Sequence, residues 1–239
     1  LHKMKILHRD LKSDNVLLTT SDPENIVCKI IDFGLSYTLD NEADRSKDIE
    51  SGDAAGVGTP AYMAPEMLTN DNKALHDYPF ACDIYSYGIL AYVVLTYSTR
   101  IYPHEKGGGR EILWAVVHRG LRPAIIKNIE RHLPHLPPEA DGSAPPTLSF
   151  DQLIENISTQ ISPLIGKLYG NLITLIRQCW EGKAEKRPNF TRIANEMSNC
   201  FIEQNSNMDE LRKLYKLPLP THVSGSSEPE QNLDELESS

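Results

Sequence analysis

The sequence lacks any closely spaced pair of cysteines. Its 239 residues include four cysteines, Cys28, Cys82, Cys179 and Cys200, and no C-x-x-C pair. Disulfide frameworks and structural zinc sites both require cysteines grouped at characteristic spacings. The scattered thiols therefore exclude a disulfide scaffold and predict a reduced, intracellular protein, which we place in the cytoplasm.

The chain also has no hydrophobic run long enough to cross a membrane, and it has few positive charges. The longest stretch without a charged residue, 84–99, has sixteen residues and is interrupted by tyrosine, serine and threonine. A membrane span needs about twenty predominantly apolar residues, so we expect a buried helix here and no membrane span. Lys and Arg number 24 against 33 Asp and Glu, and the net charge of −9 argues against nucleic-acid binding.

The remaining composition is that of a globular protein, with 40% hydrophobic and 24% charged residues. Two short runs rich in β-branched residues, 16–18 and 26–31, flank Ser-Asp-Pro-Glu-Asn and predict a β-hairpin. Elsewhere the apolar periodicity predicts helices, which we place at 81–95, 110–118, 125–132, 164–180 and 190–202. The expected fold is therefore mainly α with one short hairpin.

Three segments have a composition that favours irregular structure. Residues 35–57 form a polar loop with six acidic and two basic residues, and we expect it to be mobile. Residues 121–150 contain six prolines and predict an irregular insert. The end of the chain is rich in Ser, Glu and Pro. We therefore expect a folded domain over 1–202 and a C-terminal extension over 203–239, disordered from about 219.

Two motifs near the start of the chain carry candidate chemistry. The segment 8–15, His-Arg-Asp-Leu-Lys-Ser-Asp-Asn, fits the pattern H-R-D-L-x-x-x-N, and Asp-Phe-Gly follows at 32–34. The predicted hairpin between them can bring Asp10 and Asp32, 22 positions apart, to one phosphate-sized site. Asp10 is the candidate proton acceptor, Asn15 and Asp32 are oxygen ligands of the kind that Mg²⁺ prefers, and Lys12 can offset charge on a transferred group.

These motifs resemble the catalytic loop and metal-binding triplet of eukaryotic protein kinases. Three further landmarks follow in the same order as in that family. Residues 58–66, Gly-Thr-Pro-Ala-Tyr-Met-Ala-Pro-Glu, resemble the substrate-binding segment, which contains Thr59 and ends in A-P-E. The resemblance implies that Asp83 anchors the backbone of the catalytic loop, and that Arg187 pairs with Glu66 in a buried ion pair.

Lys12 and the G-T-P-x-Y segment resemble serine/threonine kinases. Ser13, the Gly-Leu-Arg-Pro segment at 120–123 and the Cys-Trp…Arg-Pro stretch resemble their tyrosine-kinase-like branch. The resemblance implies transfer of phosphate from ATP, with Mg²⁺, to serine and threonine hydroxyls of protein substrates. It assigns nucleotide and metal binding to Lys12, Asn15 and Asp32.

The sequence departs from the family in one large respect. It contains no G-x-G-x-x-G, and only seven residues precede His8, so the ATP-covering N-terminal β-rich lobe is absent. The chain is therefore expected to be a kinase C-terminal lobe that is inactive alone. Either it is a fragment of a longer kinase that supplies the missing N-lobe, or it is a non-catalytic lobe that serves as an interaction module or scaffold.

A regulatory role is also implied by the resemblance. In similar kinases the arginine before the catalytic aspartate, here Arg9, helps to hold a phosphate on the activation loop. Within the loop 35–57 we expect Ser46 or Ser51 to be the modified residue, since both follow the first acidic cluster.

Overall fold

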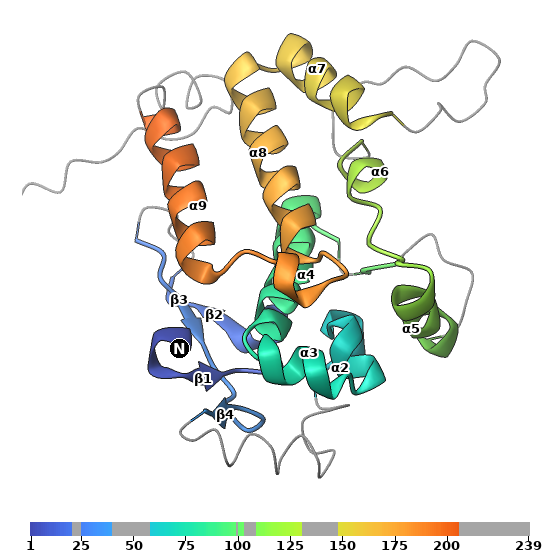
Figure 1. The fold of residues 1–239 in the computed structure, drawn as a ribbon. Helices are drawn as coiled ribbons and strands as arrows, with labels where there is room; N and C mark the ends of the chain where they lie inside the picture. The colour runs from blue at the N-terminus through green and yellow to red at the C-terminus, as the bar shows by residue number, and fades with distance from the viewer. Residues whose placement is uncertain (21–24, 40–57, 99, 103–108, 131–147, 206–239) are drawn as a thin grey trace, which may run out of the picture. The chain divides into compact units, whose positions relative to one another are not determined.

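The computed structural model describes residues 1–20, 25–39, 58–98, 100–102, 109–130 and 148–205. Most of these residues are helical, as the sequence predicts (Figure 1). The helices are α2 (Pro65–Thr69), α3 (Asn72–Asp77), α4 (Ala81–Thr96), α5 (Gly109–His118), α6 (Ile125–Glu130), α7 (Phe150–Gln160), α8 (Pro163–Cys179) and α9 (Phe190–Asn205). Four short 3-10 helices accompany them: η1 (His2–Met4), η2 (Ser13–Asn15), η3 (Pro60–Tyr62) and η4 (Ala184–Lys186).

Two small antiparallel sheets lie beside the helices. In one, β1 (Ile6–Leu7) pairs with β4 (Tyr37–Thr38). In the other, β2 (Val16–Leu18) pairs with β3 (Cys28–Ile30) in the register Val16↔Ile30. The second sheet is the predicted hairpin, and it leaves large apolar side chains exposed, including those of Leu17, Leu18 and Val27.

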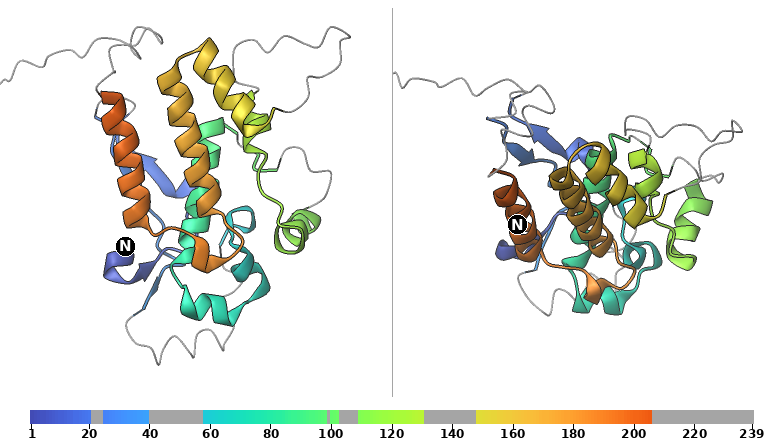
Figure 2. Two further views of the ribbon diagram at one scale, coloured as in Figure 1. Left: turned by 45° about the horizontal axis from the view of Figure 1, so that its top comes forward. Right: turned by 90° about the horizontal axis from the view of Figure 1, so that it is seen from above.

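Helix α4 is the centre of the compact unit, Leu1–Phe201. It is apolar on nearly all sides, which is expected of a helix surrounded by other elements, and ten of its sixteen residues are buried. The core cluster of Ile84, Leu175, Cys179 and Ile193 joins α4 to α8 and α9. Both views of Figure 2 show α4 running beside α8. A Cβ atom at Gly88 of α4 would lie 2.8 Å from that of Cys179, so this close crossing requires glycine.

Helix α7 is a feature that the sequence reading missed. It begins at Phe150, the last residue of the segment predicted to be an irregular insert, and it packs on α8 with Leu153 and Ile157 buried. Ser149 and Gln152 form a reciprocal capping box at its first turn. That S-x-x-Q pattern is a helix-start signal which was present in the sequence.

All four cysteines are free, as expected from their spacing. Desolvation by burial raises the pKa of the Cys82 thiol well above its ordinary value. In the described part of the chain, every helix is too short or too polar to span a bilayer. The loop 35–57 was predicted to be mobile, but its residues Tyr37–Thr38 form β4. Residues 40–57 of this loop, most of the proline-rich insert and the tail beyond 205 lie outside the described residues.

Candidate active site

Asp83, in the first turn of α4, binds the backbone of the catalytic loop through its carboxylate. One carboxylate oxygen of Asp83 accepts the backbone N–H of His8 and the other accepts that of Arg9, both at 2.8 Å. The imidazole Nε2 of His2 lies 2.9 Å from the same carboxylate. Arg9 has a φ of 64°, a conformation that costs a non-glycine residue free energy unless its surroundings impose it. The hydrogen bond from its N–H to Asp83 contributes to holding this conformation, in line with the predicted anchoring role.

Asp10 lies at the centre of a hydrogen-bonded group and is only 6% exposed. Its Oδ1 accepts the backbone N–H of Thr59 at 2.8 Å and the Thr59 hydroxyl at 2.7 Å. Its Oδ2 lies 2.8 Å from Nζ of Lys12 and accepts Nδ2 of Asn15 at 3.1 Å. The structure therefore brings together four of the residues predicted from the sequence.

These contacts determine the charge state of the site. Desolvation alone would raise the pKa of Asp10, but the hydrogen bonds from Lys12 and Thr59 and the Lys12 charge outweigh it and hold the pKa below its ordinary value. The hydrogen bond to Asp10 likewise raises the pKa of Lys12. Both groups are therefore charged near neutral pH. Asp10 is a good hydrogen-bond acceptor and a weak base under these conditions.

The substrate-binding segment can approach the catalytic loop closely because residue 58 is glycine. Gly58 has a φ of 115°, and a Cβ atom there would lie 2.6 Å from the carbonyl oxygen of Arg9. This approach lets Thr59 reach Asp10. It also lets the Thr59 hydroxyl accept a hydrogen bond of 2.8 Å from Nζ of Lys12.

Asn15 and Asp32 are brought together by the β2–β3 hairpin. The backbone carbonyl of Asn15 accepts the N–H of Ile31, the residue before Asp32, at 3.0 Å. Asp32 also lies close enough to Lys12 for its charge to raise the pKa of that lysine. The two candidate metal ligands are therefore neighbours of the Asp10 group.

The oxygen donors of this pair fit Mg²⁺. The side-chain amide nitrogen of Asn15 donates to Asp10, which leaves the side-chain carbonyl oxygen of Asn15 for a cation. Asp32 contributes an exposed carboxylate. Within the described ranges, His, Cys, Asp and Glu form no group of three or more that could hold a metal ion. Two protein ligands suit Mg²⁺ bound together with a nucleotide, since that ion usually shares its coordination with phosphate and water.

Three residues that the sequence reading left without a role also contact the site. The hydroxyl of Tyr62, in the substrate-binding segment, lies 3.3 Å from that of Ser13, and the Ser86 hydroxyl of α4 donates to the Tyr62 carbonyl at 2.9 Å. The backbone of the substrate-binding segment is thereby tied to α4. Local sequence gave no signal for these contacts, because the three residues lie far apart in the chain.

The predicted ion pair between Glu66 and Arg187 is present and buried. Arg187 donates through Nη1 and Nη2 to the two carboxylate oxygens of Glu66, at 2.6 and 2.8 Å. It also donates to the carbonyl oxygen of Ala81 at 2.9 Å. The pair ties the end of the substrate-binding segment to α4 and to the segment before α9.

Arg9 contacts the start of the predicted activation loop. Its Nε donates to the carbonyl oxygen of Leu35 at 2.6 Å, and its guanidinium lies 5.5 Å from the centre of the Tyr37 ring. Ser46 and Ser51 lie outside the described residues, so the phosphate-binding role of Arg9 stays a prediction.

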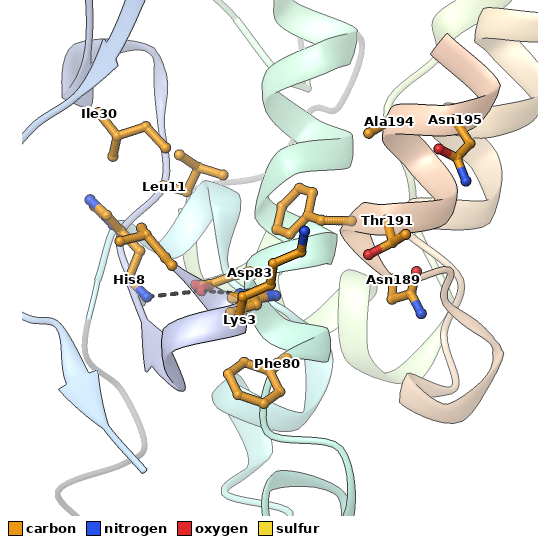
Figure 3. A pocket seen from close by; sticks show the side chains of 13 residues that line it. Lys3, His8, Leu11, Ile30, Phe80, Asp83, Asn189, Thr191, Ala194 and Asn195 are labelled. Carbon is orange, nitrogen blue, oxygen red and sulfur yellow. Dashed lines mark hydrogen bonds and ion pairs between the residues drawn. The ribbon is translucent and has the colours of Figure 1, made fainter. Parts of the chain in front are cut away.

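A pocket of about 680 Å³ lies behind the catalytic loop. His8, Leu11, Phe80, Asp83 and Phe190 are among its lining residues, and Figure 3 shows the hydrogen bond between His8 and Asp83. Asp10, Lys12, Asn15 and Asp32 do not line it. The pocket is therefore separate from the group of candidate catalytic residues.

Comparison with known proteins identifies the family. The family model described as "Protein kinase domain" matches residues 1–197. Receptor-interacting serine/threonine-protein kinase 3 of Rattus norvegicus is 32% identical over 213 residues, which cover 84% of this chain and 33% of that protein. Mitogen-activated protein kinase kinase kinase 7 of Bos taurus is 35% identical over 141 residues, which cover 57% of this chain and 21% of that protein.

The chain thus spans about a third and about a fifth of the lengths of these two relatives. A solved structure of the Rad53 kinase domain and SCD2 aligns over 82% of this chain and 48% of its own, with 19% identity and a TM-score of 0.46. The family match covers most of the chain and includes both motifs from which the resemblance was first inferred. The chain belongs to the protein kinase domain family.

Proposed function

We propose that this chain provides the catalytic loop, the metal ligands and the substrate-binding segment of a serine/threonine protein kinase, which transfers the γ-phosphoryl group of ATP to protein hydroxyls. The observation that carries the proposal is the hydrogen-bonded group of Asp10, Lys12 and Thr59. This group holds the carboxylate of Asp10 and the ammonium group of Lys12 side by side. The candidate metal ligands Asn15 and Asp32 are its neighbours.

In this proposal Asp10 orients the attacking hydroxyl by accepting its hydrogen bond. The substrate oxygen forms a bond to the γ-phosphorus, the bond from that phosphorus to the bridging oxygen of ADP breaks, and the hydroxyl proton passes to Asp10. A weak base is sufficient, since the hydroxyl becomes acidic only as its bond to phosphorus forms. Lys12 lies beside the same carboxylate and can offset negative charge on the transferred group.

Asn15 and Asp32 would hold Mg²⁺ together with the phosphates of ATP. When bound, the ion would neutralise charge on the β- and γ-phosphates. Thr59, fixed between Asp10 and Lys12, would set the position of the substrate backbone. A purely structural interaction module would have no physical need for these ionised groups at one site, which disfavours the scaffold alternative.

The test compares two variants of the protein in its full natural length. Asp10→Asn should lower kcat by at least about a hundredfold with little change in ATP affinity, because it removes the proton acceptor. Asp32→Ala should in addition weaken Mg-ATP binding. The products should be phosphoserine and phosphothreonine. Parental rates in both variants would refute the catalytic assignment, and predominant phosphotyrosine would refute the substrate class.

A further inference from the structure

Helix α5 has one face that combines an exposed tryptophan with basic side chains. Arg110, Trp114 and His118 are spaced four residues apart, so they form a stripe along one side of the helix, and Arg119 follows directly. All four side chains are exposed. We call these four residues the Trp114 face. The opposite side of α5 is buried through Ala115 and Val116, and α5 packs mainly on α2 (Figure 1).

The aromatic ring at the centre of this face is exposed and flanked by basic groups. Trp114 is 56% exposed, whereas the other tryptophan, Trp180, is 5% exposed. The imidazole of His118 lies 4.9 Å from the Trp114 ring, and the guanidinium of Arg119 lies 5.8 Å from it. These contacts restrict the indole, so little side-chain entropy remains to be lost when a ligand binds. Tryptophan and arginine are also the residues most enriched among binding hot spots.

The charge of this face is opposite to that of the whole chain. Arg110, His118 and Arg119 are basic. The one acidic residue of α5, Glu111, is exposed and lies beside the stripe, about 60° from Trp114 around the helix, so the basic groups on this face outnumber it. The chain as a whole carries a net charge of −9. A locally basic face on an acidic protein is complementary to an acidic ligand and is a poor match for a basic one.

We propose that the Trp114 face is a docking site for an acidic segment of a protein substrate. The stripe from Arg110 to His118 is about 12 Å long at 1.5 Å per residue, which about four residues of extended peptide would cover. An apolar side chain of that segment would lie on the Trp114 ring, and its carboxylates would pair with Arg110 and Arg119. The identification of the partner as a substrate rests on the proposed function, but the binding itself does not.

The experiment measures binding directly, without phosphoryl transfer, on the 239-residue chain. The probe is a fluorescein-labelled twelve-residue peptide of Glu and Asp with one central Leu, followed by anisotropy. Matched peptides replace the acidic residues with Gln or with Lys, and a single-stranded DNA of equal charge serves as a second polyanion. Unlabelled acidic peptide should also change tryptophan fluorescence, since Trp114 is the exposed indole.

We expect saturable binding of the acidic peptide that weakens as salt rises from about 50 to about 500 mM. Trp114→Ala should weaken it by about fivefold or more, and the double variant R110E/R119E by about tenfold or more. The control K73E/K183E makes the same change in net charge at two exposed lysines of α3 and of the segment before η4, and should bind as the parent does. Thermal melting confirms that each variant is folded.

Three results would overturn the proposal. The first is no saturable binding, or equal binding of the Gln or Lys peptide. The second is an equal loss in the K73E/K183E control, because binding would then depend on net charge alone. The third is tighter binding of the DNA, which would assign the face to another kind of polyanion. Failure here leaves the catalytic proposal intact, and loss of activity in Asp10→Asn leaves the docking proposal intact.

Discussion

Asp10 is the central residue of the candidate site, and Lys12 favours the ionised form of the Asp10 carboxylate. Burial acts to raise the pKa of Asp10, while Lys12 and Thr59 lower it by a larger amount. We therefore predict that Lys12→Met raises the pKa of Asp10, as measured by NMR titration of its carboxyl carbon. Lys73→Met, at an exposed lysine of α3, is the control and should leave this pKa unchanged.

The same substitution should change the pH dependence of stability. The pKa of Asp10 in the folded protein is lower than its ordinary value of 3.8. Its contribution to stability is therefore present above about pH 4 and is lost as the pH falls through the folded-state pKa. Lys12→Met should move the folded-state pKa toward the ordinary value, so this contribution becomes smaller and the variant should unfold at a higher pH on acidification. An acid-unfolding curve at the parental pH would show that Lys12 does not stabilise the ionised carboxylate.

Glu66 and Arg187 provide a second test at the scale of single residues. Arg187→Ala leaves the buried carboxylate of Glu66 without its partner and should lower the free energy of unfolding by about 3–5 kcal/mol. Arg192→Ala removes an exposed pair with Glu196 and should cost about 0–1 kcal/mol. Denaturant unfolding measures both. The double variant Glu66→Ala/Arg187→Ala should lose less than the sum of its single variants, since neither charge is then left alone.

At the scale of helices, the crossing of α4 and α8 depends on Gly88. A methyl group there would lie 2.8 Å from the Cβ of Cys179 and 3.3 Å from the backbone nitrogen of Trp180. Gly88→Ala should therefore force the helices apart and cost about 1–3 kcal/mol in unfolding free energy. Gly109→Ala, where nothing lies within 4 Å, is the control and should change stability by no more than about 0.5 kcal/mol. Equal melting temperatures for the two variants would contradict this account.

The sequence was sufficient to predict the elements with strong patterns. The long uncharged run predicted α4, and the β-branched runs on each side of a turn predicted β2 and β3. The reading missed α2 and α3, which have only five and six residues, and it missed α7, whose low apolar content hid it despite the capping box. Short helices of this kind are stabilised mainly by what they pack against, and local sequence records that poorly.

The residues of the candidate site likewise divide into those that the sequence could predict and those that only the structure revealed. Asp10, Lys12, Asn15, Asp32, Thr59 and Asp83 could be named from motifs, because the motifs fix residue types at fixed spacings. The roles of Ser13, Tyr62 and Ser86 could not, because they arise from contacts between residues up to 49 positions apart. Gly58 belongs to a recognised motif, yet the reason for glycine became clear only from its φ and its distance to Arg9.

At the scale of the whole molecule, Asp10 and Asn15 are buried, whereas the candidate metal ligand Asp32 lies at an exposed surface. Asp32 and Phe33 are exposed, and the neighbouring hairpin exposes Leu17, Val27 and Ile30. Small-molecule sites usually bury most of their ligand in a concave pocket, and the pocket behind the catalytic loop does not include the candidate catalytic residues. The sequence also contains no G-x-G-x-x-G that could cover the phosphates.

We therefore predict that the 239-residue chain alone binds Mg-ATP with a dissociation constant of about 1 mM or weaker, and that it shows no measurable phosphoryl transfer. Isothermal titration calorimetry and a radiolabelled-phosphate assay are the measurements. Asp32→Ala is the control, because it should abolish any weak binding that involves the predicted metal ligands. Micromolar affinity of the parental chain would contradict the prediction, since the groups present in this chain would then suffice to hold a nucleotide. Weak binding unchanged by Asp32→Ala would place it away from Asn15 and Asp32.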